Sequence, residues 1–154
     1  MDGRVDPKVR IGLAVLGAFQ LAIGLWAVLD PAGWFRDFPG FGDRLVVAAG
    51  GPFNEHLATD AGAAFVATGL GLVVAAVVAT RSGALVALVA ILGFAIPHFG
   101  YHVINPAGSA GSSANVLSLV SLGISVGFPA LLLWWNRAPR ESDDPSETVV
   151  DSAA

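Results

Sequence analysis

The segment that decides the fold runs from Phe53 to Thr80, FNEHLATDAGAAFVATGLGLVVAAVVAT, and it is apolar over most of its length. It is long enough to cross a bilayer as a helix, because the hydrocarbon core needs about 20 apolar residues at about 1.5 Å each. Three more apolar runs of comparable length occur at 11–29, 84–104 and 114–135. The sequence therefore predicts an all-α fold, an integral membrane four-helix bundle with spans at about 11–29, 53–80, 84–104 and 114–135.

The composition is typical of a membrane protein. Of the 154 residues, 55% are hydrophobic and 13% are charged, whereas charged residues make up about a quarter of an ordinary soluble domain. The length indicates a single domain. The chain has no cysteine, which excludes disulfides, thiolate metal ligands and thiol catalysis. It has a net charge of −4 and no strongly basic patch, so no nucleic-acid partner is expected.

The segments outside the four spans are expected to be a terminal segment, loops and a tail. Residues 1–10 are polar, and the apolar run after them is longer than that of a signal peptide, so we expect a retained anchor. Residues 30–52 form a long outer loop, which is either a surface-lying loop or a lid over the polar site. Residues 81–83 are expected to form a tight hairpin between the second and third spans. Residues 136–154 are acidic and contain proline, which predicts a disordered cytoplasmic tail.

The placement of lysine and arginine predicts the orientation of the spans. Six of these residues fall on the side of the two termini and the 81–83 hairpin, and two fall on the side of the 30–52 loop. Both termini are therefore expected in the cytoplasm, and the 30–52 loop is expected to face outward. An abundance of alanine, glycine and arginine over lysine hints at a bacterial source, so we expect a multi-pass protein of the bacterial plasma membrane, surrounded by the lipid bilayer.

Two pairs of side chains, each four residues apart, form the candidate site. His56 and Asp60 lie at the start of the second span, and His98 and His102 lie at the end of the third. Residues four apart share one face of a helix. All three histidines of the chain belong to these pairs. Counted from the predicted hairpin, Asp60 and His102 differ in depth by roughly 3 Å, and His56 and His98 by roughly 15 Å.

The donor types of these two pairs favour a transition metal. Three imidazoles and a carboxylate suit zinc, iron or copper, although tilt or a kink at Pro97 is needed to gather all four around one ion. The predicted ligands are His56, Asp60, His98 and His102. The polar residues expected around them are Asn54, Glu55, Tyr101, Asn105 and Asn115, of which Asn54 is also expected to cap the second span.

Other interpretations of the same residues stay open. Haem is the less expected cofactor and would take His56 and one histidine of the third span as axial ligands. The ionisable groups can instead serve proton transfer or contact a substrate, as such groups inside membranes often do. Alternatively, the polar side chains form a packing network, and the protein is a non-catalytic membrane subunit or structural protein.

Several small residues indicate helix packing. Gly123 and Gly127 have the small-xxx-small spacing found where membrane helices meet. Gln20 is expected at a helix interface too. A polar stripe along the fourth span has the same interpretation: Asn115, Ser118, Ser121 and Ser125. The chain contains no nucleophile elbow, phosphate loop or dinucleotide fingerprint.

Two motifs resemble a known group of proteins. The stretch Gly-Pro-Phe-Asn-Glu-His-Leu-x-x-Asp-x-Gly at 51–62 and the stretch Pro-His-x-x-Tyr-His at 97–102 are similar to motifs of an uncharacterised family of small actinobacterial four-helix membrane proteins, DoxX-like in general architecture. The likeness covers the membrane portion and not the tail. It implies the fold and the location. DoxX relatives are associated with quinone-linked oxidation, so a quinone or other membrane subunits are partners by analogy of fold.

The expected function is metal- or cofactor-assisted redox chemistry on a small or lipid-soluble molecule at an outward-facing His/Asp site. No motif names the substrate. The competing expectation is the non-catalytic subunit described above.

Overall fold

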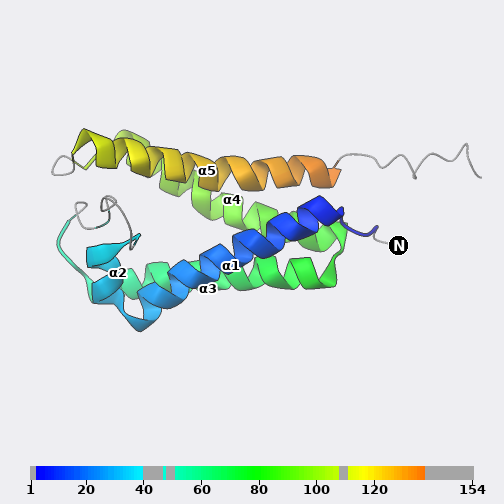
Figure 1. The fold of residues 1–154 in the computed structure, drawn as a ribbon, viewed down its shortest axis with the longest axis horizontal. Helices are drawn as coiled ribbons and strands as arrows, with labels where there is room; N and C mark the ends of the chain where they lie inside the picture. Colours follow the sequence, from blue (N-terminus) through cyan, green and yellow to red (C-terminus); the bar gives the residue numbers. More distant parts are fainter. Residues whose placement is uncertain (1–2, 40–46, 48–50, 108–110, 138–154) are drawn as a thin grey trace, which may run out of the picture.

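The computed structural model of the chain describes residues 3–39, 47, 51–107 and 111–137, and this part contains five helices and no named strand. Four helices are long: α1 (Pro7–Leu29), α3 (Glu55–Val78), α4 (Arg81–Ile104) and α5 (Ser112–Arg137). A short helix, α2 (Pro31–Asp37), lies between α1 and α3. Each long helix is long and apolar enough to cross a membrane, which is compatible with a multi-pass membrane protein. The predicted all-helical class with four apolar spans is confirmed (Figure 1).

Capping residues account for the helix starts. α1 begins at Pro7 rather than at 11, because the Asp6 carboxylate accepts a hydrogen bond from the Lys8 N–H at 2.7 Å and proline is favoured in a first turn. Asn54 caps α3 as predicted, and its side chain accepts from the Leu57 N–H at 3.1 Å.

The hairpin between α3 and α4 lies two residues earlier than predicted. Ala79 adopts a left-handed backbone with a φ of 56°, which ends α3. The Thr80 hydroxyl then accepts from the Gly83 N–H at 3.2 Å and caps α4. The prediction of a turn at residues 81–83 is therefore wrong, because these residues form the first turn of α4.

The fourth span extends further than predicted at its carboxyl end. α5 continues to Arg137, so Asn136 is not part of the tail. Asn136 is buried, and its side-chain amide donates to the Arg81 carbonyl at 2.9 Å. The rest of the predicted tail, 138–154, lies outside the described residues, as do residues 40–46 and 48–50 of the predicted outer loop.

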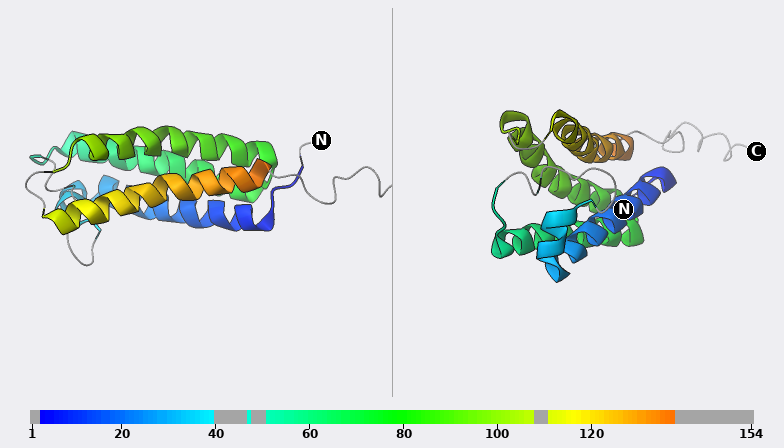
Figure 2. Two further views of the ribbon diagram at one scale, coloured as in Figure 1. Left: turned by 90° about the horizontal axis from the view of Figure 1, so that it is seen from above. Right: turned by 60° about the vertical axis from the view of Figure 1, so that its left-hand side comes forward.

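The long helices form two pairs rather than an evenly packed bundle. α1 packs on α3 and α4 packs on α5, whereas no contact joins α3 to α5 among the described residues. The pairs meet at the end where α3 turns into α4, called here the hairpin end, and separate toward the end that carries α2, called the α2 end (Figure 1). The right-hand view of Figure 2 shows the same separation.

Four glycines bring the backbones of α1 and α3 together. Gly17 and Gly24 on α1 lie opposite Gly69 and Gly62 on α3, so the two helices run antiparallel. A Cβ atom at Gly24 would lie 2.7 Å from the Val66 nitrogen and 2.8 Å from the Gly62 oxygen. Such close approach increases the van der Waals contact between membrane helices, which is the main attraction available to them in lipid.

The packing predictions from the sequence have mixed outcomes. Gln20 is buried against α3, where its Cβ would lie 3.1 Å from a Cβ atom at Gly69, so its interface position is confirmed. Among the described residues, nothing packs on Gly123 or Gly127, because an added Cβ at either position would meet nothing within 4 Å. On the same helix Ser118 is buried, as expected of a packing residue.

A buried apolar cluster joins the two pairs at the hairpin end. The N-terminal segment closes this end, since the Val5 N–H donates to the Ala79 carbonyl at 3.0 Å and the Arg81 N–H donates to the Gly3 carbonyl at 3.1 Å. The cluster consists of Val5, Val9, Leu13, Leu16, Leu72, Ala75, Ala76, Ala79, Ala84, Leu88, Ile91 and Leu132.

At the opposite end, α2 covers α1 and α3. Asp30 ends α1, and its carboxylate accepts from the Gly33 N–H at 2.9 Å, which starts α2. Trp34 is buried together with Ala27 of α1 and Ala58 of α3. On the outside of α2, hydrogen bonds to the Asp37 carboxylate, together with its negative charge, raise the pKa of the exposed Arg36 guanidinium. Among the described residues, α2 contacts neither α4 nor α5, so this part of the 30–52 loop covers only one helix pair.

Candidate functional site

His98 and His102 continue the buried face of α4. The buried residues of this helix are spaced by four, three and four residues: Ala84, Leu88, Ile91 and Ala95. His98 and His102 follow at three and seven residues beyond Ala95, so they lie on the same face. Both are only half buried, since α3 has moved away from α4 at this height (Figure 1).

A row of rings holds the two imidazoles in place. Phe65 of α3 contacts Phe94 of α4 with ring centroids 5.4 Å apart, and His98 stacks on Phe94 at 5.5 Å with an interplanar angle of 17°. His102 meets His98 edge-on at 5.0 Å, and Tyr101 meets His102 at 5.5 Å. Within the described ranges, no hydrogen bond or ion pair holds either imidazole, so their nitrogens can bind another molecule.

His56 and Asp60 face the outside of α3. The His56 Nε2 and Asp60 Oδ2 atoms are 3.4 Å apart, and the two side chains are 88% and 62% exposed. Asp60 and Gly62 point about 200° apart around the helix, because they are two residues apart. Since Gly62 packs on α1, the His56–Asp60 pair lies on the opposite side of α3.

The two pairs lie at equal heights but on different faces. At about 1.5 Å per residue from the helix ends Val78 and Arg81, Asp60 and His98 lie about 27 and 26 Å along their helices, and His56 and His102 about 33 and 32 Å. The heights differ from the prediction because α3 ends two residues earlier, and α4 begins three residues earlier, than expected. No Asp60–His102 contact forms, because Asp60 points away from α1 and α4 diverges.

The four predicted ligands therefore do not converge. Among the described residues, no three His, Asp or Glu side chains lie close enough to hold one metal ion. Each pair offers two donors, and two histidines four apart on a helix are a known half-site for zinc. Metal binding at either pair stays a prediction, and so does haem.

The polar residues predicted around the ligands act mainly at helix ends. Asn54 is the cap described above, and Glu55 is exposed in the first turn of α3. Asn105 ends α4, and its amide donates to the Tyr101 carbonyl at 2.9 Å. Tyr101 is 61% exposed and contacts His102 through its ring. Of these four, Tyr101 is thus the one that touches a predicted ligand.

Asn115 fastens the connection between α4 and α5. Its side chain accepts from the Ala107 N–H at 3.2 Å and donates to the Ala107 carbonyl at 3.1 Å. These contacts fix the α2 end of the α4–α5 pair, and they explain the polar residue that begins the stripe on α5.

Asn115→Ala is expected to lower the free energy of unfolding by about 1–3 kcal/mol, because its two hydrogen bonds to Ala107, of about 1 kcal/mol each, and a longer one to the Gly111 carbonyl are lost. Thermal unfolding in detergent, followed by circular dichroism, measures the effect. Ser121→Ala is the control, since the Ser121 hydroxyl bonds the Ser118 carbonyl of its own helix. Equal melting temperatures of the two variants would contradict the fastening role.

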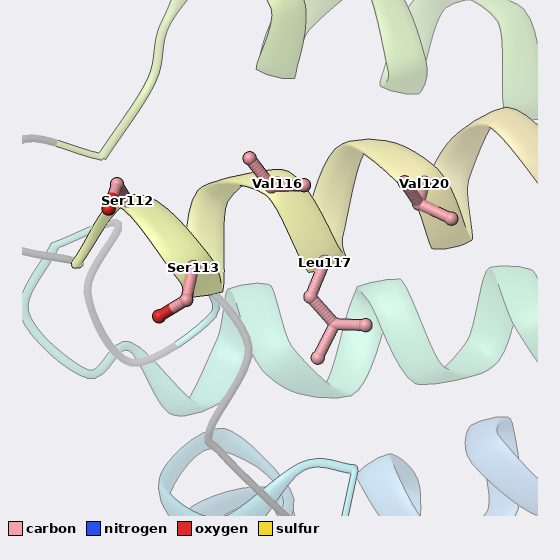
Figure 3. A pocket seen from close by; sticks show the side chains of 5 residues that line it. All are labelled: Ser112, Ser113, Val116, Leu117 and Val120. Carbon is pink, nitrogen blue, oxygen red and sulfur yellow. The ribbon is translucent and has the colours of Figure 1, made fainter.

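An open hollow of about 440 Å³ lies at the first turns of α5, at the α2 end. Its lining is apolar apart from two hydroxyls: Ser112, Ser113, Val116, Leu117 and Val120. In Figure 3 Ser113 and Leu117 point toward the α1–α3 pair, and Val116 points the other way. No residue pattern predicts this hollow, because valine and leucine at helical spacing look the same whether they face lipid, protein or a ligand.

Comparison with known proteins does not assign this chain to a family. No family model, curated protein or solved structure matches it. The likeness of the 51–62 and 97–102 motifs to actinobacterial DoxX-like proteins stays a prediction, and a function has to be supported by the residues themselves.

Proposed function

We propose that this chain is an integral protein of the bacterial plasma membrane that binds a small or lipid-soluble molecule between its two helix pairs, with His98 and His102 as polar contacts. The proposed reaction is redox chemistry on that molecule, assisted by a metal or another cofactor. One observation carries the proposal. The two imidazoles occupy the core-facing stripe of α4 at a height where α3 no longer covers it.

The energetics of an imidazole in lipid support a ligand at this position. If α4 spans the membrane, His98 lies inside the hydrocarbon, which is about 30 Å thick. Ionisable residues at such depth face a cavity or a partner, because a buried polar group left without a hydrogen bond costs about 1–3 kcal/mol. A neutral imidazole carries one donor and one acceptor nitrogen. The site therefore favours an apolar molecule that bears a carbonyl or hydroxyl group.

Partners of the proposed reaction follow from the same donors. A quinone is one lipid-soluble molecule of this kind, and its carbonyl oxygens would accept from the imidazole N–H groups. His98 and His102 would hold zinc, iron or copper as two of its ligands, and bound iron or copper would supply electron transfer. Other membrane subunits are proposed to exchange electrons with the site.

His98→Ala is expected to weaken binding of a short-chain quinone at least tenfold, because the deepest polar contact is lost. Quenching of tryptophan fluorescence measures this in nanodiscs, with zinc, iron and copper contents measured on the same samples. His56→Ala is the control for quinone binding, since His56 is exposed on another face. Equal binding by the wild type and His98→Ala, or no saturable binding of quinone or metal by the wild type, would remove the proposal.

A packing role is the second candidate, and the stacking of His98 on Phe94 favours it. Phe94 in turn contacts Phe65, so the row of rings links α3 to α4. His98→Phe separates the two candidates, because it keeps the ring and removes the nitrogens. A packing role predicts an unchanged melting temperature and unchanged binding, whereas the proposed function predicts lost binding in a protein of unchanged stability.

A further inference from the structure

We infer that His56 and Asp60 form half of a transition-metal site that a second copy of this chain completes with the same two residues. This site is separate from the proposed one at His98 and His102. The distance between His56 Nε2 and Asp60 Oδ2 is 3.4 Å, longer than an ordinary hydrogen bond of about 2.7–3.2 Å. Two donors that bind one tetrahedral ion at about 2.0–2.1 Å stand roughly 3.3 Å apart. The pair is already spaced as one edge of such a site.

Within the part of the chain that the structure describes, the pair lacks further donors. Tetrahedral zinc takes four ligands, and the described residues bring no third His, Asp or Glu side chain to the pair. Glu55 precedes His56 by one residue and points about 100° away around the helix. A twofold axis repeats the same residues on both sides of an interface, so a second copy supplies two more donors and completes a His2Asp2 set.

The surface of α3 along the same side fits a second α3 helix. Ala63, Ala67 and Gly71 follow Asp60 at three, seven and eleven residues, and all three are exposed. A Cβ atom at Gly71 would meet nothing within 4 Å. Small residues at this spacing let the backbones of two membrane helices approach closely. The opposite side of α3 is occupied by α1, so this side is open to another molecule.

The arrangement is self-complementary in charge and in height. Two copies that share one orientation in a membrane are related by an axis along the membrane normal, which places the α3 helices parallel and His56 and Asp60 of the two copies at one level. Asp60 lies at the edge of the apolar stretch, where a carboxylate facing lipid is unfavourable. A histidine from the second copy, or an ion shared with it, removes that cost.

Ala67→Cys is expected to give covalent dimers in native membranes treated with a short bis-maleimide, and zinc is expected to raise the yield. The chain has no cysteine, so the introduced thiol is unique. Val86→Cys is the matched control, because Val86 is 69% exposed on α4 outside the proposed interface. Equal cross-linking of the two variants, or a dimer yield that does not fall with a chelator, would overturn the inference.

Titration of the purified His98→Ala variant with Co²⁺ tests the ligand set, because the proposed function gives His98 and His102 a metal site of their own. The expected result is a tetrahedral Co²⁺ absorption band that saturates at half an ion per chain, together with dimers in light scattering. His56→Ala or Asp60→Asn, added to this variant, is expected to lower both signals at least tenfold. Because the variant lacks the proposed site at His98 and His102, the titration distinguishes the two sites. Saturation at one ion per monomer, or an unchanged titration after His56→Ala is added, would contradict a shared site.

Discussion

Gly24→Ala is expected to lower the free energy of unfolding by about 3 kcal/mol, at the upper end of the range for overpacked positions. The added methyl group would lie 2.7 Å from the Val66 nitrogen and 2.8 Å from the Gly62 oxygen. Both are backbone atoms of α3, which cannot rotate away as a side chain can. The only relief is to move the α1 and α3 axes apart, which weakens contacts along both helices.

Gly123→Ala is the matched control, because the same methyl group there meets nothing within 4 Å. Alanine is also a better helix former than glycine by about 1 kcal/mol, so this variant should be as stable as the wild type or slightly more stable. Thermal unfolding in one detergent, followed by circular dichroism, compares the two variants. Equal melting temperatures of the Gly24→Ala and Gly123→Ala variants would show that α1 and α3 do not approach so closely.

Leu88→Ala is expected to lower the free energy of unfolding by about 2–5 kcal/mol, the range found when a large buried side chain is truncated. Leu88 is fully buried in the cluster that joins the two helix pairs at the hairpin end. Truncation leaves a cavity between helices that are held together there by van der Waals contact. The separation of the pairs toward the α2 end leaves few other contacts to compensate.

Leu25→Ala makes the same chemical change at a position that is 47% exposed on α1. The free energy of unfolding should fall by less than about 1 kcal/mol, because the surrounding medium fills the space that this half-exposed side chain leaves. Unfolding in increasing denaturing detergent measures both variants. If Leu88→Ala and Leu25→Ala lower the free energy of unfolding equally, the hairpin-end cluster does not hold the two helix pairs together.

The positions of the four spans could be predicted because the length of an apolar run reports directly on its ability to cross a membrane. The predicted ends of the helices were less accurate than the positions of the spans, because helix ends depend on capping residues. Asp6 and Thr80 start helices on polar residues that the hydropathy pattern assigns to loops. The short α2 was missed for a related reason. Asp30 and Pro31 end α1 and also begin α2. Because aspartate and proline are common both after the end of a helix and at the start of one, the sequence alone did not show that a second helix follows.

The faces of the helices could not be predicted from the sequence. A helix that is apolar on all sides has no amphipathic stripe to show which side meets protein. Gly24 and Gly62 lie at a helix interface, whereas Gly123 and Gly127 lie in the open, although all are glycines in apolar surroundings. The difference comes from the partner helix and not from the local sequence.

The same limit applies to the candidate site. The spacing of four residues correctly placed His56 beside Asp60 and His98 beside His102. It could not predict whether the pairs meet, because the rotation of α3 is set by how Gly62 packs on α1. That contact turns the His56–Asp60 pair outward.

The pairing of the N-terminal segment with the α3–α4 turn sets an order of events during biosynthesis. The Gly3 carbonyl accepts from the Arg81 N–H, and the Val5 N–H donates to the Ala79 carbonyl, so the segment before α1 can form these bonds only after residues made much later have been translated. The Asn136 side chain then binds the carbonyl of the same Arg81. The segment before α1, the α3–α4 turn and the last turn of α5 thus meet at one place, and assembly of the hairpin end is completed only when that last turn of α5 has been translated.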